Sequence, residues 1–182
     1  MKLYYPGTLI ETDEISAEKA RLTFGAVFSA GGLLLSQVSA LSGIELYTVQ
    51  NWVKRGFCSP PSGKKYTARQ FCRLLTINML KDALTIPEIT GLLSSINGQL
   101  SDESDDLIAD DELYYYFIEV ISGISSITEK DIDRAVSDVV SGYFEPYAGV
   151  RNRLSAVLRI MSYAYYSSVF RRASSALLEK LR

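Results

Sequence analysis

The sequence predicts an all-α protein in two parts, an N-terminal part at residues 1–100 and a helical C-terminal part at residues 101–182. Apolar residues recur at helical spacing along most of the chain, and they make up 47% of its 182 residues. That fraction is typical of a folded protein, and the length allows one sizeable core or two small ones. Two further features predict this architecture. One is a glycine between two short segments of helical periodicity, and the other is a proline-containing loop with paired lysines.

The N-terminal residues lead into a supporting helix. Residues 1–14 are expected to be extended or irregular, with a turn at Pro6–Gly7. Ser16 is a suitable capping residue for a helix that Gly31–Gly32 ends, and one face of that helix is apolar: Ala20, Phe24, Val27 and Phe28. We expect this helix to close the core of the following segment from behind.

Two short helices are predicted on either side of Gly43. The first, Leu35–Ser42, has an apolar face at i, i+3 spacing, and Gly43 supplies the positive φ that a tight turn between helices needs. The second, at residues 46–55, directs polar side chains away from its apolar face: Tyr47, Thr48, Gln50, Asn51 and Lys54. Two short helices across a glycine turn form the pattern of a helix-turn-helix, whose second helix enters the DNA major groove.

These polar side chains suit the recognition of double-stranded DNA. The amides of Gln50 and Asn51 can each pair with adenine through two hydrogen bonds, and Thr48 can contact a thymine methyl group. Lys54 and the adjacent Arg55 can neutralise phosphates. The second helix is therefore predicted to read base edges and to bind the DNA backbone at its C-terminal end.

The loop that follows, at residues 58–66, has the composition of a wing. The second helix ends at the glycine of Arg55–Phe57, and Pro60–Pro61 prevents an immediate restart. Ser62–Gly63 can form a turn, which leads to the side chains Lys64, Lys65 and Tyr66. A short, proline-stiffened loop with basic residues at its far side is typical of a wing that contacts the DNA backbone beside the groove.

The segment from Gly43 to Phe57, GIELYTVQNWVKRGF, with Lys64–Thr67 and the following helix, resembles the winged helix-turn-helix of MerR-type transcription regulators. More narrowly, NWVKRG, the PP loop, KKYT and the helix followed by Leu84–Ile89 are similar to an uncharacterised bacterial family of MerR-like proteins labelled as a domain of unknown function. The resemblance covers roughly residues 30–97.

The resemblance implies DNA binding by analogy. It implies that Tyr47, Thr48, Gln50 and Asn51 face DNA and that Lys64 is the cation of the wing. Two positions depart from the MerR pattern of two aromatic residues followed by an acidic one: Asn51 replaces the first aromatic residue, and Val53 stands at the acidic position. The scheme of backbone contacts in MerR proteins therefore does not transfer unchanged.

Charge is unevenly distributed along a chain whose net charge is −2. Between Leu46 and Lys81 there are no acidic residues and seven basic ones: Lys54, Arg55, Lys64, Lys65, Arg69, Arg73 and Lys81. Between Asp82 and Glu129 there are eleven acidic residues and no basic ones. Such segregation predicts a positive field over the helix-turn-helix despite the acidic total. The alternative is that these basic side chains lie on ordinary solvated faces.

Further helices are predicted by their capping residues. Thr67 can cap a helix that runs to about Leu80, and Thr85 with Pro87 in the first turn can start another. The polar stretch Ser101–Asp106 is interpreted as a solvated linker between residues 1–100, the DNA-binding part, and residues 101–182. An acidic interaction patch is the alternative interpretation of that stretch.

The C-terminal part is predicted to hold three helices. They start at Asp110–Glu112, where acidic residues complement the helix dipole, at the capping-box pattern Thr128–Asp131, and near Tyr147. In the last helix, apolar residues recur at helical spacing, and three leucines close the run: Leu154, Leu158, Met161, Tyr165 and Val169, then Leu177, Leu178 and Leu181. This helix can serve as a dimerisation surface or pack entirely in the core, and the sequence leaves both possibilities open.

The leading hypothesis is a sequence-specific DNA-binding protein that regulates transcription as a homodimer, because two copies would read a palindromic site. The alternative is a helical module that binds a protein or a small-molecule effector and in which the helix-turn-helix is only structural. An effector pocket in the C-terminal part would be lined by aromatic side chains: Tyr114, Tyr115, Tyr116, Phe117, Tyr163, Tyr165 and Tyr166. Aromatic residues at helical spacing more commonly fill a core.

An enzyme is not expected, because the chain has no histidine and no glycine-rich phosphate loop. Cys58 and Cys72 are too few ligands for a zinc site, so no metal or other cofactor is expected, and both thiols are expected to stay reduced. The N-terminus lacks the pattern of a signal peptide, and no apolar stretch reaches the ~18 residues of a transmembrane helix. We therefore expect a cytoplasmic protein with no membrane partner.

Overall fold

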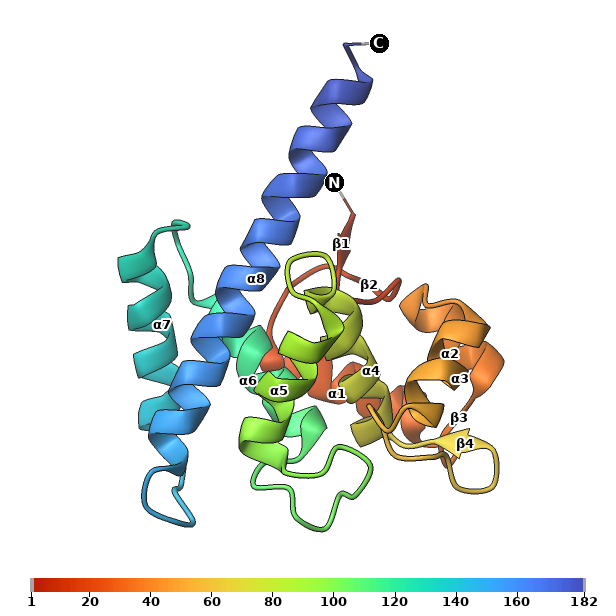
Figure 1. Ribbon diagram of the computed structural model, residues 1–182. Helices are drawn as coiled ribbons and strands as arrows, with labels where there is room; N and C mark the ends of the chain where they lie inside the picture. The colour runs from red at the N-terminus through yellow and green to blue at the C-terminus, as the bar shows by residue number, and fades with distance from the viewer. Residues whose placement is uncertain (1, 182) are drawn as a thin grey trace.

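The computed structural model describes residues 2–181, in which the chain forms eight α-helices and two small antiparallel sheets. The helices surround a central pair, α4 and α6, and the last helix extends well beyond the others (Figure 1). The mostly helical class predicted from the sequence is confirmed. None of the helices in residues 2–181 combines the length and apolar content that crossing a membrane requires.

The chain begins with a short hairpin and the supporting helix. Strand β1 (Leu3–Tyr4) pairs with β2 (Glu11–Thr12), and the turn between them contains Gly7. Helix α1 (Ala17–Phe28) begins at the predicted cap, since the Ser16 side chain accepts a hydrogen bond from the Lys19 amide. Its buried residues lie on the apolar face that the sequence predicts.

The next elements are the two predicted short helices and a two-stranded sheet. Helices α2 (Leu35–Ser42) and α3 (Leu46–Lys54) are joined through Gly43, which has a φ of 71° as the turn requires. Strand β3 (Leu33–Leu34) precedes α2 and pairs antiparallel with β4 (Lys65–Tyr66). The predicted wing at residues 58–66 therefore folds back onto the start of the α2–α3 pair.

Helices α4 (Ala68–Leu80) and α5 (Ile86–Asn97) start at the predicted threonine caps. In each case the threonine side chain accepts a hydrogen bond from the third amide of the helix, and the glutamine or glutamate side chain at that third position accepts one from the backbone amide of the threonine. These reciprocal bonds satisfy amides that a helix start leaves unpaired. The sequence thus locates the beginnings of both helices correctly.

Three helices complete the chain: α6 (Asp110–Ser122), α7 (Glu129–Ser141) and α8 (Val150–Glu179). Thr128 caps α7 by accepting a hydrogen bond from the Asp131 amide, as predicted. Helix α6 packs against α4 and α1, and α7 and the first half of α8 cover its other sides. Helices α6 and α8 are therefore in contact with the N-terminal elements, and α7 packs on these two helices.

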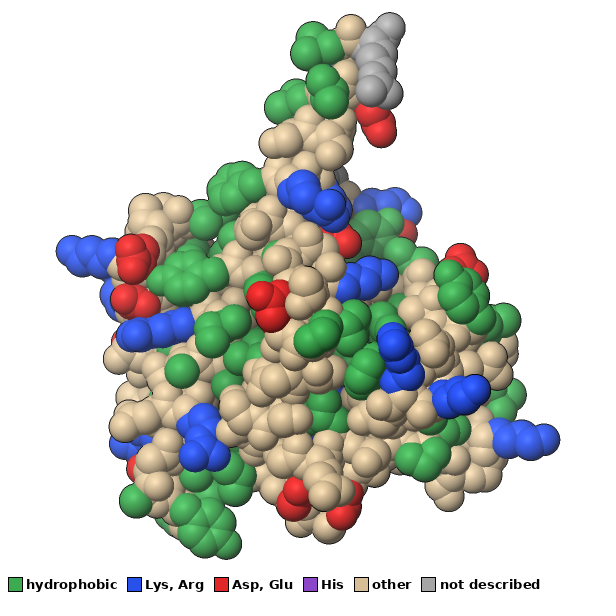
Figure 2. Space-filling view, in the orientation of Figure 1, with side chains coloured by type: hydrophobic (Ala, Val, Ile, Leu, Met, Phe, Trp, Pro, Cys, Tyr) green, Lys and Arg blue, Asp and Glu red, His purple; other side chains and the backbone are tan. Residues whose placement is uncertain are grey.

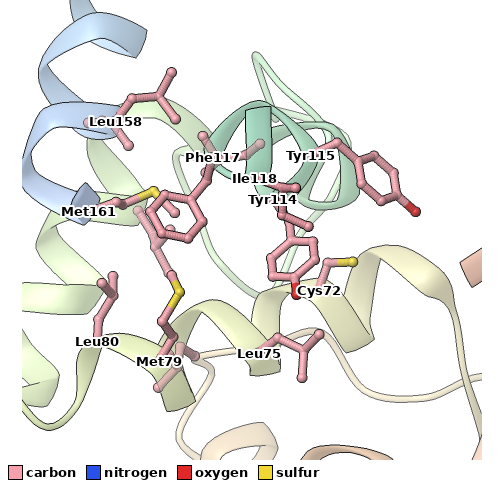
Figure 3. Close-up of a cluster of buried hydrophobic side chains, with 14 of the residues drawn as sticks. Cys72, Leu75, Met79, Leu80, Tyr114, Tyr115, Phe117, Ile118, Leu158 and Met161 are labelled. Atoms are coloured by element: carbon pink, nitrogen blue, oxygen red, sulfur yellow. The ribbon is translucent and has the colours of Figure 1, made fainter. Parts of the chain in front are cut away.

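One hydrophobic core runs through both parts of the chain, 1–100 and 101–182. Figure 3 shows its centre, where side chains of α4, α6 and α8 meet: Cys72, Leu75, Met79, Leu80, Tyr114, Tyr115, Phe117, Ile118, Leu158 and Met161. The ring of Tyr114 stacks on Phe24 at a centroid distance of 5.6 Å, and its hydroxyl donates a hydrogen bond to the carbonyl of Pro6. The aromatic run of α6, considered above as a pocket lining, thus contributes to the core.

The acidic stretch Ser101–Asp106 is not a simple solvated linker. The Asp106 carboxylate has no exposed surface and lies 3.1 Å from the Arg69 guanidinium, and Glu103 lies 3.4 Å from the same side chain. Ser59, at the start of the wing, donates a hydrogen bond of 2.6 Å to Glu103. The stretch therefore holds α4 and the wing together.

Candidate nucleic-acid interface

Helix α3 is anchored by two side chains and exposes the rest of its surface. Val49 is fully buried and Trp52 is 6% exposed, which fixes one face against the core. On the opposite face Tyr47 is 72% exposed, and four more of the predicted site residues are exposed: Gln50, Asn51, Lys54 and Arg55. Thr48 is half-buried. The structure therefore leaves both amides of the predicted recognition helix free to meet a ligand.

The turn before α3 is tied to the core by hydrogen bonds. The Ser42 hydroxyl donates to the carbonyl of Val38 and accepts from the amide of Ile44, at 2.7 and 3.1 Å. The Asn78 side-chain amide donates to the carbonyls of Ser42 and Gly7, both at 3.3 Å. These bonds set the direction of α3 relative to α4. No local sequence pattern marks Asn78, because only the fold places it beside the turn.

The wing contains a tight turn at residues 62–65, with Lys64 at its tip. The Lys65 amide donates to the Ser62 carbonyl at 2.9 Å, and Gly63 and Lys64 have φ values of 55° and 66°. Positive φ at both central residues is what a type I′ hairpin turn requires. Lys64 and Lys65 are exposed, and the Lys65 ammonium donates to the carbonyl of Ala30 at 3.3 Å.

Tyr66 does not fit the predicted interface. Its side chain is only 3% exposed, because Tyr66 pairs with Leu33 in the sheet and packs into the core. Burial also raises the pKa of its hydroxyl. The expectation that the Tyr66 side chain contacts DNA is therefore wrong, and its role is to attach the wing to the body of the protein.

A hollow lies between α3 and the wing and brings together four of the nine predicted site residues, whereas Tyr47, Thr48, Asn51, Arg55 and Lys65 do not line it. Its volume is about 440 Å³, and both apolar and polar side chains line it: Leu35, Gln50, Val53, Lys54, Pro61, Lys64 and Tyr66. Lys54 and Lys64 thus face one space from opposite sides, with Gln50 beside them. In Figure 2, basic side chains in blue are visible over this side of the molecule, around α2, α3 and the wing.

Three of the seven basic residues counted above are not part of this surface: Lys81, which follows the end of α4 remote from the wing, and two arginines. Arg73 is 2% exposed, and its Nε donates to the Asp110 carboxylate at 2.5 Å. Arg69 forms ion pairs with Asp106 and Glu103 at 3.1 and 3.4 Å. These arginines neutralise acidic residues of the following segment, so the positive field over the wing and α3 comes from Lys54, Arg55, Lys64 and Lys65.

The start of the wing, at Ser59 and Pro60, is held by a network of hydrogen bonds that no local sequence pattern indicates. The Gln70 side-chain amide donates to the Ser59 hydroxyl at 2.9 Å and to the Pro60 carbonyl at 3.0 Å. Ser59 in turn donates to Glu103, which also pairs with Arg69. Because a glutamine at the third position of a capped helix is typical of a capping box, the sequence can indicate that role for Gln70. Its second role, in orienting the wing, follows only from its buried position in the fold.

The Asp106 carboxyl is predicted to give folding stability a pH dependence. Burial and the nearby Asp110 raise its pKa from 3.8 to about 7, while Arg73 and Arg69 limit the rise. The folded state therefore binds this proton more tightly than the unfolded state, so the stability that it contributes is present below about pH 4 and is lost as the pH rises through 7. Asp106→Asn should flatten this dependence.

The measurement is the urea midpoint between pH 5 and 8. We expect wild type to lose stability relative to Asp106→Asn as the pH rises. The matched control is Asp102→Asn in the same stretch, where the pKa of the exposed carboxyl is lowered by hydrogen bonds to Ser104. An unchanged pH profile in Asp106→Asn would contradict the prediction.

Comparisons with known proteins locate a similar segment. Residues 33–117 match the model of a family described as Domain of unknown function (DUF1836). The Uncharacterized protein YkrK of Bacillus subtilis (strain 168) is 33% identical over 79 residues, which are 41% of this chain and 34% of that protein. The chain thus spans about a third of the length of this relative. No solved structure matches the chain.

The family match begins at β3 and ends within α6. It therefore contains α3, the wing and the paired charges of Arg73 and Asp110, and it crosses residue 100. Helix α8 lies outside it.

Proposed function

We propose that this protein binds double-stranded DNA sequence-specifically and regulates transcription, with α3 in the major groove and the wing at residues 58–66 on the adjacent backbone. The observation that carries the proposal is the hollow in which Gln50 and Lys54 of α3 face Lys64 of the wing. A MerR-like winged helix-turn-helix is the class of DNA-binding module that we propose for residues 33–80. The resemblance of the α3 and wing sequences to that class supports it.

In the proposed complex, different side chains of α3 and the wing contact the bases and the DNA backbone. Tyr47 and Thr48 lie in the first turn of α3, the end from which a recognition helix contacts base edges. Gln50 and Asn51 follow with free amides, which can each form two hydrogen bonds with adenine. The cations at the end of α3 and on the wing would bind phosphates, which fix the position of the protein but carry no sequence information.

The first test is the salt dependence of duplex binding. If Lys54, Arg55, Lys64 and Lys65 each neutralise one phosphate, the logarithm of the binding constant should fall against the logarithm of salt concentration with a slope of about −3 to −4 per chain. Lys54→Ala and Lys64→Asn should each reduce that slope by about 1. Asparagine tolerates positive φ, so it removes the charge of Lys64 while keeping the turn.

The matched control is Lys130→Ala, which removes an exposed lysine from the distant helix α7. It should leave the slope unchanged. A binding constant insensitive to salt, or one that Lys130→Ala lowers as much as Lys54→Ala does, would overturn the proposal in favour of a helix-turn-helix with only a structural role.

Base recognition is tested separately with the two amides. After selection of bound sites from random duplexes, Gln50→Ala and Asn51→Ala should each weaken binding to the selected site by about 1–3 kcal/mol and change binding to unrelated DNA little. Competition titrations measure both affinities. Asn152→Ala, at an exposed position in the first turn of α8, is the control. Equal losses on both kinds of DNA would assign these amides to the backbone rather than to base edges.

A further inference from the structure

Two large apolar side chains stand next to each other at the start of α3. Leu46, the first residue of the helix, is 46% exposed, and Tyr47 is 72% exposed. Within residues 2–181, neither side chain belongs to the hydrophobic core or packs against it. The fold therefore presents an apolar surface at the end of α3 from which a recognition helix contacts base edges.

The exposed face of α3 carries two parallel rows of side chains. Residues four apart are neighbours on the surface of a helix, so every fourth residue belongs to the same row. Each row begins with an apolar side chain, continues with an amide and ends with a cation: Leu46, Gln50 and Lys54 in the first row, and Tyr47, Asn51 and Arg55 in the second. All six residues are exposed. The amide and the cation of the first row line the hollow beside the wing, whereas no residue of the second row does.

We propose that Leu46 and Tyr47 contact the C5-methyl groups of thymines in the major groove, and that α3 therefore selects a site rich in A·T pairs. The inference rests on the proposed function, in which Gln50 and Asn51 bind adenines. Every adenine bound in this way is paired with a thymine, and the thymine methyl projects into the same groove. An apolar side chain is the complement of that methyl group.

The spacing within each row fits the spacing of base pairs. Residues four apart are separated by about 6 Å along a helix axis. Two base-pair steps advance by about 6.8 Å along the DNA. When α3 lies along the groove, the apolar side chain of each row thus reaches a thymine about two base pairs from the adenine that the amide of the same row binds.

The exposure of these side chains decides which of them contact the methyl groups. Thr48 is half-buried beside the fully buried Val49, so its own methyl group has less access to the groove than Leu46 and Tyr47 have. Removing one methyl group from water against an apolar side chain should change the binding constant by about 3- to 5-fold. An effect of that size is measurable at a single thymine.

Replacing thymine with uracil tests the inference, because uracil lacks only the methyl group. In a site selected from random duplexes, each thymine is replaced in turn, and competition titrations measure the binding of the full chain. Two replacements should each weaken binding of the wild type by about 3- to 5-fold. Leu46→Ala should be insensitive to one of them and Tyr47→Ala to the other. Tyr47→Phe keeps the aromatic ring and should respond as the wild type does.

The positions of the two thymines test the assignment of the rows. Each should lie about two base pairs from the adenine whose recognition is lost in Gln50→Ala or in Asn51→Ala. The matched control is Ile127→Ala, which removes a 45% exposed side chain next to α7 and should leave both uracil effects unchanged. Alanine is favourable in helices, so the α3 variants are expected to fold, and thermal unfolding followed by circular dichroism verifies this.

The outcomes separate this inference from the proposed function. A wild type that binds no duplex would overturn both. Sequence-specific binding that no uracil replacement weakens would overturn only the methyl contacts. Uracil effects that persist in both Leu46→Ala and Tyr47→Ala would also overturn them, because other side chains would then contact the methyl groups.

Discussion

Replacing Arg73 with alanine is expected to lower the free energy of unfolding by about 3–5 kcal/mol. Arg73 is 2% exposed, and its guanidinium lies 2.5 Å from Asp110 and 3.8 Å from Asp106. Removing it leaves the buried Asp110 carboxylate without its nearest cation and leaves Asp106 with Arg69 alone, at 3.1 Å. Desolvated charge of this kind is far more costly than the loss of an exposed ion pair. Urea unfolding at pH 7 measures the change.

The pH dependence of this loss identifies its cause. The pKa of Asp106 and that of Asp110 are both raised by burial, and Arg73 opposes the rise in each. Without Arg73 the carboxyls can become neutral by binding protons, so the penalty should shrink as the pH is lowered from 8 to 5. Arg73→Met with Asp110→Asn should recover part of the stability, because it removes the unpaired charge and keeps the volume filled.

The control is Arg134→Ala, since Arg134 is 58% exposed and pairs with Asp131 on the surface of α7. Its effect should stay below about 1 kcal/mol. A loss for Arg73→Ala as small as this, or one independent of pH, would show that the buried pair contributes little to folding.

The role of Arg73 marks a limit of sequence-based inference. Charge segregation along the chain correctly indicates that basic and acidic segments differ, but it assigns all basic residues to one surface. Arg69 and Arg73 are four residues apart, as are Asp106 and Asp110. That matching spacing in two segments of opposite charge was a usable indication of pairing. Deciding between it and a DNA-facing role requires the packing of α6 on α4, which no local pattern encodes.

Local features were far more predictable than long-range ones. The caps at Ser16, Thr67, Thr85 and Thr128 are correct because each depends on residues within three positions along the chain. The exposure of Gln50 and Asn51 follows from the period of a single helix. Asp106, by contrast, lies in a polar stretch and is buried because of partners far away in the sequence. The extent of α8 beyond the core depends likewise on the size of the body beneath it.

Gly32 shows how one residue can combine both kinds of constraint. The sequence suggests that Gly31–Gly32 ends a helix, and α1 does end shortly before them at Phe28. Gly32 has a further role, because it lies beside β4. A side-chain carbon at this position would lie 2.9 Å from the carbonyl oxygen of Tyr66 and 3.2 Å from Cβ of Lys65. The close approach of the wing therefore requires a glycine at a position remote from it in sequence.

Gly32→Ala is accordingly expected to destabilise the protein by about 2–4 kcal/mol and to displace the wing. The φ of 99° at this position strains any L-residue, and the new methyl group collides with backbone that cannot move without breaking the pairing of β3 with β4. Gly25→Ala is the matched control, because Gly25 lies within α1 with open space around it and should instead gain about 0.5–1 kcal/mol. Urea midpoints compare the two variants.

The Gly32→Ala variant also distinguishes the contribution of the wing to DNA binding from that of α3. Amide exchange at Lys65 and Tyr66 should accelerate in Gly32→Ala, while the amides of Val49 and Trp52 stay protected by the core. The salt slope of DNA binding should fall by about 2, the contribution proposed for Lys64 and Lys65. A stable Gly32→Ala protein with unchanged exchange at Tyr66 would mean that the sheet tolerates the methyl group, and that the wing is held mainly by Gln70 and Ser59.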